Sequence, residues 1–330
     1  MPSLPPAIAE IRLAVRTALA EIPEGSTVIV ALSGGADSLA LAAATAFEAP
    51  KLGVRAASLT VDHGLQDDSA EVASGAARTA AELGLDPLLV RVDVAGEGGP
   101  EAAARDARYG VLRDAAIDVG AAAVLLGHTL DDQAETVLLG LARGSGAASL
   151  QGMAPVREDD DGVRWVRPLL GVRRETTRAF CAASALEPWD DPHNIDGRYA
   201  RVRVRERVLP VLEAELGPGI AEALARTAEQ LREDAEAFDE MIHETIEDIV
   251  EHAEAGISVS VAALAANPAA LRNRIIRLVV DSEFGVSLTR VQTIEVARLV
   301  TDWSGQGPID LPECSVVRQG GRIVFTASGR

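Results

Sequence analysis

The stretch VIVALSGGADSLALAAATAF, residues 28–47, decides the fold class of this 330-residue chain. Its first five residues are β-branched or apolar and predict a buried strand, and the apolar run after Ser38 predicts a helix. The turn between them holds Gly34 and Gly35, which let the backbone come close to a ligand and point successive N–H groups toward it. Because a helix N-terminus adds a positive dipole, this turn predicts an anion-binding site.

The side chains of the turn suit a polyphosphate. The hydroxyls of Ser33 and Ser38 can donate to phosphate oxygens, and Asp37 could hold the Mg²⁺ that a polyphosphate needs. The opposing interpretation is a plain glycine turn in which Asp37 and Ser38 cap a helix. The combination of a strand, five defined positions and a helix favours the phosphate site. The turn lacks the Gly-Lys-Ser/Thr of a Walker A loop and the G-x-G-x-x-G of a dinucleotide fingerprint.

Short apolar runs alternate with alanine-rich stretches of helical period from residue 27 to about residue 144. This alternation predicts an α/β fold, a Rossmann-like parallel sheet with helices on both faces and ligands at the carboxyl ends of its strands. After Pro210 an acidic amphipathic stretch begins, so we expect domains at 1–210 and 211–330, the second mainly helical and ending in a β-hairpin. The predicted strands are Val28–Leu32, Val54–Val61, Leu88–Val92 and Ala122–Leu126, and the predicted helices are Ser38–Phe47, Ser69–Leu83, Glu101–Val119 and Asp131–Ala142.

The composition narrows the class of protein. Apolar residues make up 48% of the chain, enough for a real core, and no apolar run reaches membrane length. Cys181 and Cys314 stand apart rather than in a C-x-x-C pair, which argues against a disulfide framework, a zinc ribbon or an iron–sulfur site. We therefore expect a cytoplasmic protein with no membrane partner. A homodimer is left open.

The charge distribution bears on nucleic-acid binding. The formal net charge of −19 speaks against an RNA partner, because affinity for phosphate backbones comes mainly from Lys and Arg. Lys51 is the only lysine, however, so nearly all positive charge is arginine, and the arginines are clustered. As groups they could track RNA phosphates, whereas for most individual residues pairing with the acidic surplus is the better interpretation. The two groups are Arg198, Arg201, Arg203, Arg205 and Arg207, and Arg164, Arg167, Arg173, Arg174 and Arg178.

A second constellation, GHTLDDQAET at residues 127–136, follows the predicted strand Ala122–Leu126. Asp132 and Glu135 are three residues apart on the helix expected there, so they share a face and project from the carboxyl end of the strand. The two carboxylates could bind an ammonium group, take a proton from it, or help to place Mg²⁺. The alternative is that the acids at the start of this helix only favour its positive end.

The first loop, SGGADS, resembles the PP-loop of the ATP pyrophosphatases, which implies an adenine nucleotide alpha hydrolase-like fold. Further along, a whole series of motifs follows the order found in tRNA(Ile)-lysidine synthetases, over roughly residues 25–215. The motifs are VDHGL (61–65), EAAARDARY (101–109), HTLDDQAET (128–136), LLGLARGSG (138–146), SLQGM (149–153), RPLL (167–170) and DPHN (191–194). The chain is therefore identified as resembling that family.

The resemblance implies a two-step reaction. ATP adenylates the C2 carbonyl oxygen of the wobble cytidine in the CAU anticodon of tRNA(Ile), and the amino group of free L-lysine then displaces AMP to give lysidine. Carried over by motif, Asp37 would support Mg²⁺, Asp132 and Glu135 would receive the lysine ammonium, and Arg205 would contact the nucleotide or the developing charge. The residues expected to bind ATP are Ser33, Gly34, Gly35, Ala36, Asp37, Ser38, Arg105, Gly127 and His128.

The sequence departs from the family pattern in two places, and three alternative functions are weighed against this hypothesis. Val202 stands where the family commonly has Asn, and we expect the further C-terminal domain of longer members to be missing. A tRNA thiolase is the nearest rival, but it usually needs the paired cysteines or iron–sulfur cluster that the sequence does not offer. An amide-forming PP-loop enzyme would not explain the second constellation and the arginine groups together. A nucleotide-binding sensor without catalysis would leave Asp132 and Glu135 unexplained.

Overall fold

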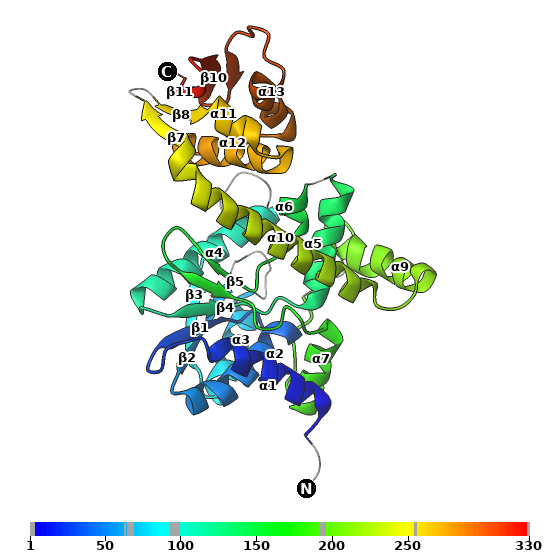
Figure 1. Ribbon diagram of the computed structural model, residues 1–330. Helices are drawn as coiled ribbons and strands as arrows, with labels where there is room; N and C mark the ends of the chain where they lie inside the picture. The colour runs from blue at the N-terminus through cyan, green and yellow to red at the C-terminus, as the bar shows by residue number, and fades with distance from the viewer. Residues whose placement is uncertain are drawn as a thin grey trace. The chain divides into compact units, whose positions relative to one another are not determined.

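The computed structural model describes residues 4–62, 64, 69–92, 100–144, 146–191, 196–253 and 256–328. The chain divides into two compact units, Met1–Arg232 and Glu233–Arg330, and the boundary in the sequence falls within helix α10 (Ile220–Ile249), which Figure 1 labels. The domain division expected at residue 210 rested on a change in sequence pattern and stays a prediction. Within the described ranges, no helix combines the length and hydropathy that a membrane span requires.

The first unit is built on a six-stranded sheet with the strand order β3-β2-β1-β4-β6-β5. Five strands run parallel and β5 pairs antiparallel with β6 at one edge. The strands are β1 (Thr27–Ala31), β2 (Arg55–Asp62), β3 (Asp86–Arg91), β4 (Ala123–Leu125), β5 (Val156–Glu158) and β6 (Arg164–Val166). The helices are α1 (Pro6–Leu19), α2 (Ala36–Glu48), α3 (Ser69–Glu82), α4 (Pro100–Asp118), α5 (Leu130–Ala142), α6 (Ala147–Leu150), α7 (Arg174–Ala183), α8 (Ala200–Arg203) and α9 (Leu209–Leu216).

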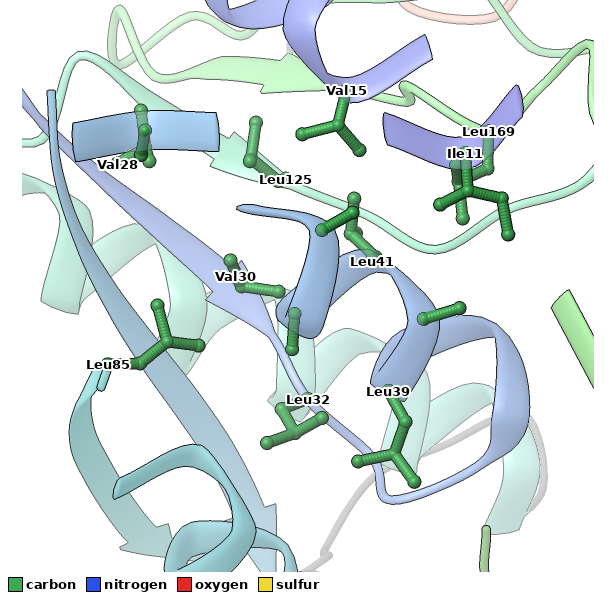
Figure 2. Close-up of a cluster of buried hydrophobic side chains, with 14 of the residues drawn as sticks. Ile11, Val15, Val28, Val30, Leu32, Leu39, Leu41, Leu85, Leu125 and Leu169 are labelled. Atoms are coloured by element: carbon green, nitrogen blue, oxygen red, sulfur yellow. The ribbon is translucent and has the colours of Figure 1, made fainter. Parts of the chain in front are cut away.

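Alternate residues of β1 enter two separate apolar cores. Val28 and Val30 pack with residues of α1, α2, α3 and α7, including Ile11 and Leu41 (Figure 2). Ile29, between them, packs with α4 on the other face of the sheet. Successive strand side chains point to opposite faces, so helices cover both faces, as the continuous apolar pattern of the strand predicts. The predicted α/β fold class, its four strands and its four helices are thereby confirmed, with element ends shifted by one or two residues.

The arginine-rich run after residue 199 forms α8, a π-helical turn at Val204–Val208 and α9 in direct succession. Pro210 explains the wider turn, because it has no N–H to donate to the carbonyl of Glu206 as an α-helix requires. Wider turns of this kind are frequent at functional sites, where they redirect a side chain. The turn carries Arg205.

The second unit has its own antiparallel sheet, with the order β7-β8-β11-β10-β9. The predicted terminal hairpin is found as β10 and β11, joined at Gly320-Gly321, and it forms the centre of this larger sheet, whose strands β7 and β8 the sequence did not predict. Its core gathers apolar residues of α12, such as Ile276 and Val280, with Phe325 of β11. The elements are β7 (Val250–Ala253), β8 (Gly256–Ser260), α11 (Val261–Ala266), α12 (Ala269–Phe284), α13 (Arg290–Thr301), β9 (Ile309–Leu311), β10 (Cys314–Gln319) and β11 (Arg322–Ala327).

Candidate active site

The glycine loop joins β1 to α2 as predicted. Gly34 has a φ of +85°, which side-chain-bearing residues rarely adopt, and Gly35 is the N-cap of α2. The Ser38 hydroxyl donates to the carbonyl of Gly35 at 3.0 Å and lies 3.1 Å from the hydroxyl of Ser33. The two hydroxyls therefore hold the loop closed. No side chain caps the start of α2, which leaves the first backbone N–H groups of the helix, from Ala36 onward, to an anion.

Asp37 lies in the first turn of α2, beside helix α7. Its Oδ1 accepts a hydrogen bond from the hydroxyl of Thr177, and its Oδ2 lies 3.5 Å from Nε of Arg174. Burial raises the pKa of this carboxyl, although the hydrogen bond from Thr177 and the charge of Arg174 oppose the shift. Asp37 is thus positioned by α7, and among the described residues its Oδ2 has one long contact to a cation.

Asp132 stabilises the N-terminus of α5. This is the role that the alternative interpretation of the sequence gave to the acidic residues at the start of this helix. Its Oδ2 accepts hydrogen bonds from the backbone N–H and the hydroxyl of Thr129, at 2.8 and 2.9 Å, to form a capping box at the start of α5. Its Oδ1 faces Arg174 at 2.8 Å. Burial opposes it, but the charge of Arg174 and the Thr129 backbone N–H together lower the pKa of Asp132. The carboxylate therefore both caps a helix and pairs with a cation.

Glu135 is fully covered, with 0% of its side chain exposed, beneath a set of arginines. Arg205 donates from Nε and from an Nη atom to its two oxygens, at 2.7 and 3.0 Å. Arg174 donates to Oε1 at 3.1 Å, and Nε of Arg201 lies 3.8 Å from Oε2. Asp132 and Glu135 share a helix face as predicted, but the structure fills the space in front of Glu135 with guanidinium groups rather than with solvent.

Arg174 is the centre of the site, although the sequence singled it out only as a member of one of the two arginine groups. It begins α7 and contacts all three carboxylates, Asp37 at 3.5 Å, Asp132 at 2.8 Å and Glu135 at 3.1 Å. Its backbone N–H also donates to Asp131 at 2.8 Å. Three carboxylates predicted at one sheet edge require a buried counter-charge, and that requirement is the signal by which Arg174 could have been found.

The remaining candidates lie beside the carboxyl end of β4. A Cβ added to Gly127 would lie 3.2 Å from the carbonyl carbon and oxygen of Asp37, so only glycine lets these two segments approach so closely. His128 is mostly buried, and burial lowers its pKa to about 4, which leaves the imidazole neutral at pH 7. Arg105 is exposed on α4, with its guanidinium carbon 5.3 Å from the ring centre of Tyr109. It does not contact the three carboxylates.

The contacts described above determine which residues could hold a metal ion. Among the described residues, no group of three or more His, Cys, Asp or Glu side chains could hold a metal ion. Protein-bound Mg²⁺ commonly takes one or two carboxylates together with the phosphates of its nucleotide, so Asp37 beside the loop fits that ion in the presence of a polyphosphate. Cys181 and Cys314 are both buried free thiols, one in each unit.

Two family models match this chain: a PP-loop domain over residues 9–212 and a TilS substrate binding domain over residues 260–324. A tRNA(Ile)-lysidine synthase of Leifsonia xyli subsp. xyli is 62% identical over 303 residues, 91% of this chain and 90% of the relative. The chain belongs to the tRNA(Ile)-lysidine synthase family. Family members of Thermobifida fusca and Salinispora tropica are 50% and 51% identical over 98% and 100% of this chain, and 98% and 99% of their own.

Among solved structures, the U34-tRNA thiolase NcsA from Methanococcus maripaludis with its [4Fe-4S] cluster superposes with a TM-score of 0.60. It covers 69% of this chain and 80% of its own chain at 21% identity, so the likeness shows a shared fold and no more. The adenine nucleotide alpha hydrolase-like fold expected from the loop is confirmed. The lysidine synthase family resemblance inferred from the motifs is confirmed as well.

Proposed function

We propose that this protein is a tRNA(Ile)-lysidine synthase, a ligase that forms a carbon–nitrogen bond. It adenylates the wobble cytidine of the CAU anticodon of tRNA(Ile) with ATP, and free L-lysine then displaces AMP to give lysidine. The observation that carries the proposal is the 62% identity over 91% of the chain to a relative of that name. The phosphate loop and the carboxylates at one edge of the sheet support it. All three substrates are available in the cytoplasm, where we place the protein.

In the first step the loop binds the ATP phosphates. The uncapped N-terminus of α2 presents N–H groups to them, and the hydroxyls of Ser33 and Ser38 can exchange their mutual contact for phosphate oxygens. Asp37 would hold Mg²⁺, which when bound neutralises the charge that gathers on the departing pyrophosphate. Gly127 supports this arrangement by letting the end of β4 lie against the first turn of α2.

In the second step the lysine amine is the nucleophile, so the site must hold its ammonium group and accept a proton. Each carboxylate oxygen offers about two acceptor positions. Oδ1 of Asp132 and Oε2 of Glu135 each accept one hydrogen bond within 3.1 Å among the described residues, which leaves one position on each. Because Glu135 is fully covered, the ammonium reaches it only when Arg174 or Arg205 moves aside. We propose that this exchange of one cation for another accompanies lysine binding.

Arg205 suits the developing charge of the adenylation step. It is held by two hydrogen bonds to Glu135 from the π-helical turn, and its Nη2 lies 3.7 Å from Oδ1 of Asp132. A guanidinium fixed in this way can stabilise an anionic transition state without reorganising. Arg205 therefore acts, in this proposal, as a positioned cation whose orientation depends on Glu135.

Some arginines of the basic run do not contact the carboxylates of the site, and these suit contact with the tRNA. In the run after residue 199, Arg201 and Arg205 turn toward Glu135, whereas Arg203 and Arg207 are exposed. Residues four apart share a helix face, so the exposed pair can follow an RNA backbone. The first departure from the family lies within this run: Val202 is buried, with 7% of its surface exposed.

The test is release of AMP and pyrophosphate from ATP in the presence of Mg²⁺, lysine and a CAU-anticodon tRNA transcript, with each component omitted in turn. The proposal predicts that transfer of labelled lysine requires every component and that Asp132→Asn lowers the rate at least a hundredfold. Release that needs tRNA but is indifferent to lysine would point to a different base-adenylating enzyme such as a thiolase. ATP binding without any release would indicate a sensor.

A further inference from the structure

A second basic cluster lies at the carboxyl ends of β4 and β6, apart from Arg174 and its carboxylates. It consists of Arg105, Arg108 and Tyr109 on α4, His128 after β4, and Arg167 after β6. The ring of Tyr109 is its centre, with the guanidinium carbons of Arg105 and Arg108 at 5.3 and 5.7 Å from the ring centroid. The charges of Arg167, Arg108 and Arg105 all bear on His128 and add to the effect of burial in lowering its pKa.

The described residues supply no counter-charge to this cluster. Within the described part of the chain, none of its three arginines forms an ion pair. Arg167 is 9% exposed, its Nη1 donates to the carbonyl of Ala154 at 2.8 Å, and its buried Nε has no hydrogen-bond partner among the described residues. The buried Nδ1 of His128 has none either. Burial lowers the pKa of both Arg108 and Arg167. It acts in the same direction at Arg174, but there the neighbouring carboxylates outweigh it and the pKa is raised.

Such an arrangement is costly for a folded protein. Buried charges are normally paired, and a buried polar atom without a partner costs about 1 to 3 kcal/mol. Asp132, the carboxylate whose charge acts on His128, is already committed to Thr129 and Arg174. The surroundings are nevertheless rigid: Tyr109 packs on Trp165, with ring centroids 5.0 Å apart, and the indole N–H of Trp165 donates to Asp159 at 2.9 Å. Among the described residues no carboxylate neutralises these guanidinium groups, so the cluster suits an anionic ligand.

We propose that Arg108 and Arg167, with Tyr109 and His128, form a binding site for a phosphate group of a substrate, next to the glycine loop and distinct from it. A phosphate has several oxygens that accept from more than one guanidinium at a time, which a single carboxylate matches less well. The position agrees with the rule that ligands of parallel sheets lie at the carboxyl ends of the strands. The proposal rests on the proposed function in one respect. The two candidate sources of the phosphate, ATP and a phosphodiester of the tRNA, are the substrates of that function.

The test compares the wild-type chain with Arg108→Gln and Arg167→Gln, beside Arg78→Gln as a matched control on the exposed surface of α3. Two dissociation constants are measured for each, one for α,β-methylene ATP by calorimetry and one for the CAU-anticodon transcript at two salt concentrations. We expect both cluster variants to weaken the same ligand at least tenfold, with Arg78→Gln within twofold of the wild type. Weaker analogue binding assigns the site to ATP, and weaker transcript binding with a salt slope reduced by about one assigns it to an RNA phosphodiester.

A thermal measurement separates binding from a structural role. Removing an unpaired buried charge leaves the melting temperature of the free protein unchanged or raises it, whereas stabilisation by inorganic pyrophosphate or by the transcript falls. Unchanged affinities for both ligands in folded variants overturn the site, as does a wild type that binds neither ligand. Should either variant fail to fold, Arg105→Gln at the exposed rim gives the same comparison. Binding without lysidine synthesis would overturn the proposed function and leave this site standing.

Discussion

Arg174 is the residue on which the geometry of the site depends most. Its guanidinium joins carboxylates from two helices, Asp37 of α2 and both Asp132 and Glu135 of α5. With 16% of its side chain exposed, it forms a largely buried ion network, and removing one partner of such a network leaves charges uncompensated. We therefore predict that Arg174→Ala lowers the free energy of unfolding by about 3 kcal/mol in chemical denaturation.

A control for this prediction lies one turn further along α7. Arg178 is 68% exposed and meets Asp190, itself 91% exposed, at 3.9 Å. Pairs of this kind contribute little in water, so Arg178→Ala should change stability by less than about 0.5 kcal/mol. Equal effects of the two substitutions would contradict the account of Arg174.

His128 makes the free energy of unfolding depend on pH. Its pKa falls from an ordinary value near 6.5 to about 4 in the folded chain, with burial as the main cause. The unfolded chain therefore binds more protons between these values, so the stability contributed by neutral His128 is present above pH 6.5 and is lost as the pH falls toward 4. We predict that His128→Gln removes about 1 kcal/mol of the stability difference between pH 6.5 and pH 5.

The comparison uses denaturation curves at both pH values, with His243→Gln as the control. His243 is an exposed histidine on α10, so its substitution controls for the loss of an imidazole that is not buried. A His128→Gln chain that loses as much stability on acidification as the wild type would show that His128 is not buried in its neutral form.

At the level of elements, the contact between the end of β4 and the start of α2 sets the shape of the phosphate loop. Alanine at Gly127 would place its Cβ 3.2 Å from backbone atoms of Asp37 and Ser38, which cannot yield as a flexible side chain can. We predict that Gly127→Ala weakens binding of an ATP analogue at least tenfold and lowers stability by about 1 to 2 kcal/mol.

Gly110 is the matched control, because it lies inside α4 with nothing within 4 Å of an added Cβ. Gly110→Ala should preserve ATP affinity and raise stability by up to about 1 kcal/mol, the usual gain from alanine in a helix. Calorimetric titration of the two variants with the ATP analogue tests this prediction. Full ATP affinity in a folded Gly127→Ala chain would contradict the role given to the close approach.

The individual helices and strands also show how much of the fold can be predicted from the sequence. The strand, glycine turn and helix of residues 28–47 are encoded locally by apolar runs and by Gly34, so they were predicted almost to the residue. In α10 the amphipathic helix was predicted, but its most buried positions include the small residues Ala221, Ala228 and Ala235, seven apart, beside Ile242 and Ile249. Alanine is compatible with burial and exposure alike, so its pattern carries little weight before packing is known.

Strands β5 to β8 were missed for a related reason. They are three to five residues long, and β5 and β7 carry charged residues at the sheet edges, so their periodicity is weak. The site was predicted in part, because Asp132 and Glu135 occur in one motif on one helix face. Arg174 reaches them from 42 and 39 residues away, and only tertiary packing sets such a contact. The residues of the predicted DPHN motif at 192–194 lie outside the described ranges.

At the scale of the whole molecule, the chain divides into two compact units, Met1–Arg232 and Glu233–Arg330. The first unit contains the matched PP-loop domain and a complete sheet, and the second contains the matched substrate binding domain. We predict that the fragment 1–232 folds and binds an ATP analogue within threefold of the full chain, while its affinity for the tRNA transcript falls at least tenfold. Circular dichroism and the two titrations test this, and full transcript affinity in the fragment would contradict it.

In the proposed function, the protein converts the wobble cytidine of its tRNA into lysidine. The most direct measurement is mass spectrometry of nucleosides from a CAU-anticodon transcript after incubation with the protein, ATP, Mg²⁺ and isotopically labelled lysine. The account predicts a wobble nucleoside heavier than cytidine by one lysine less one water, carrying the label, and absent when ATP is omitted. An unmodified wobble cytidine, in a reaction where the protein is folded and binds both ATP and the transcript, would contradict it.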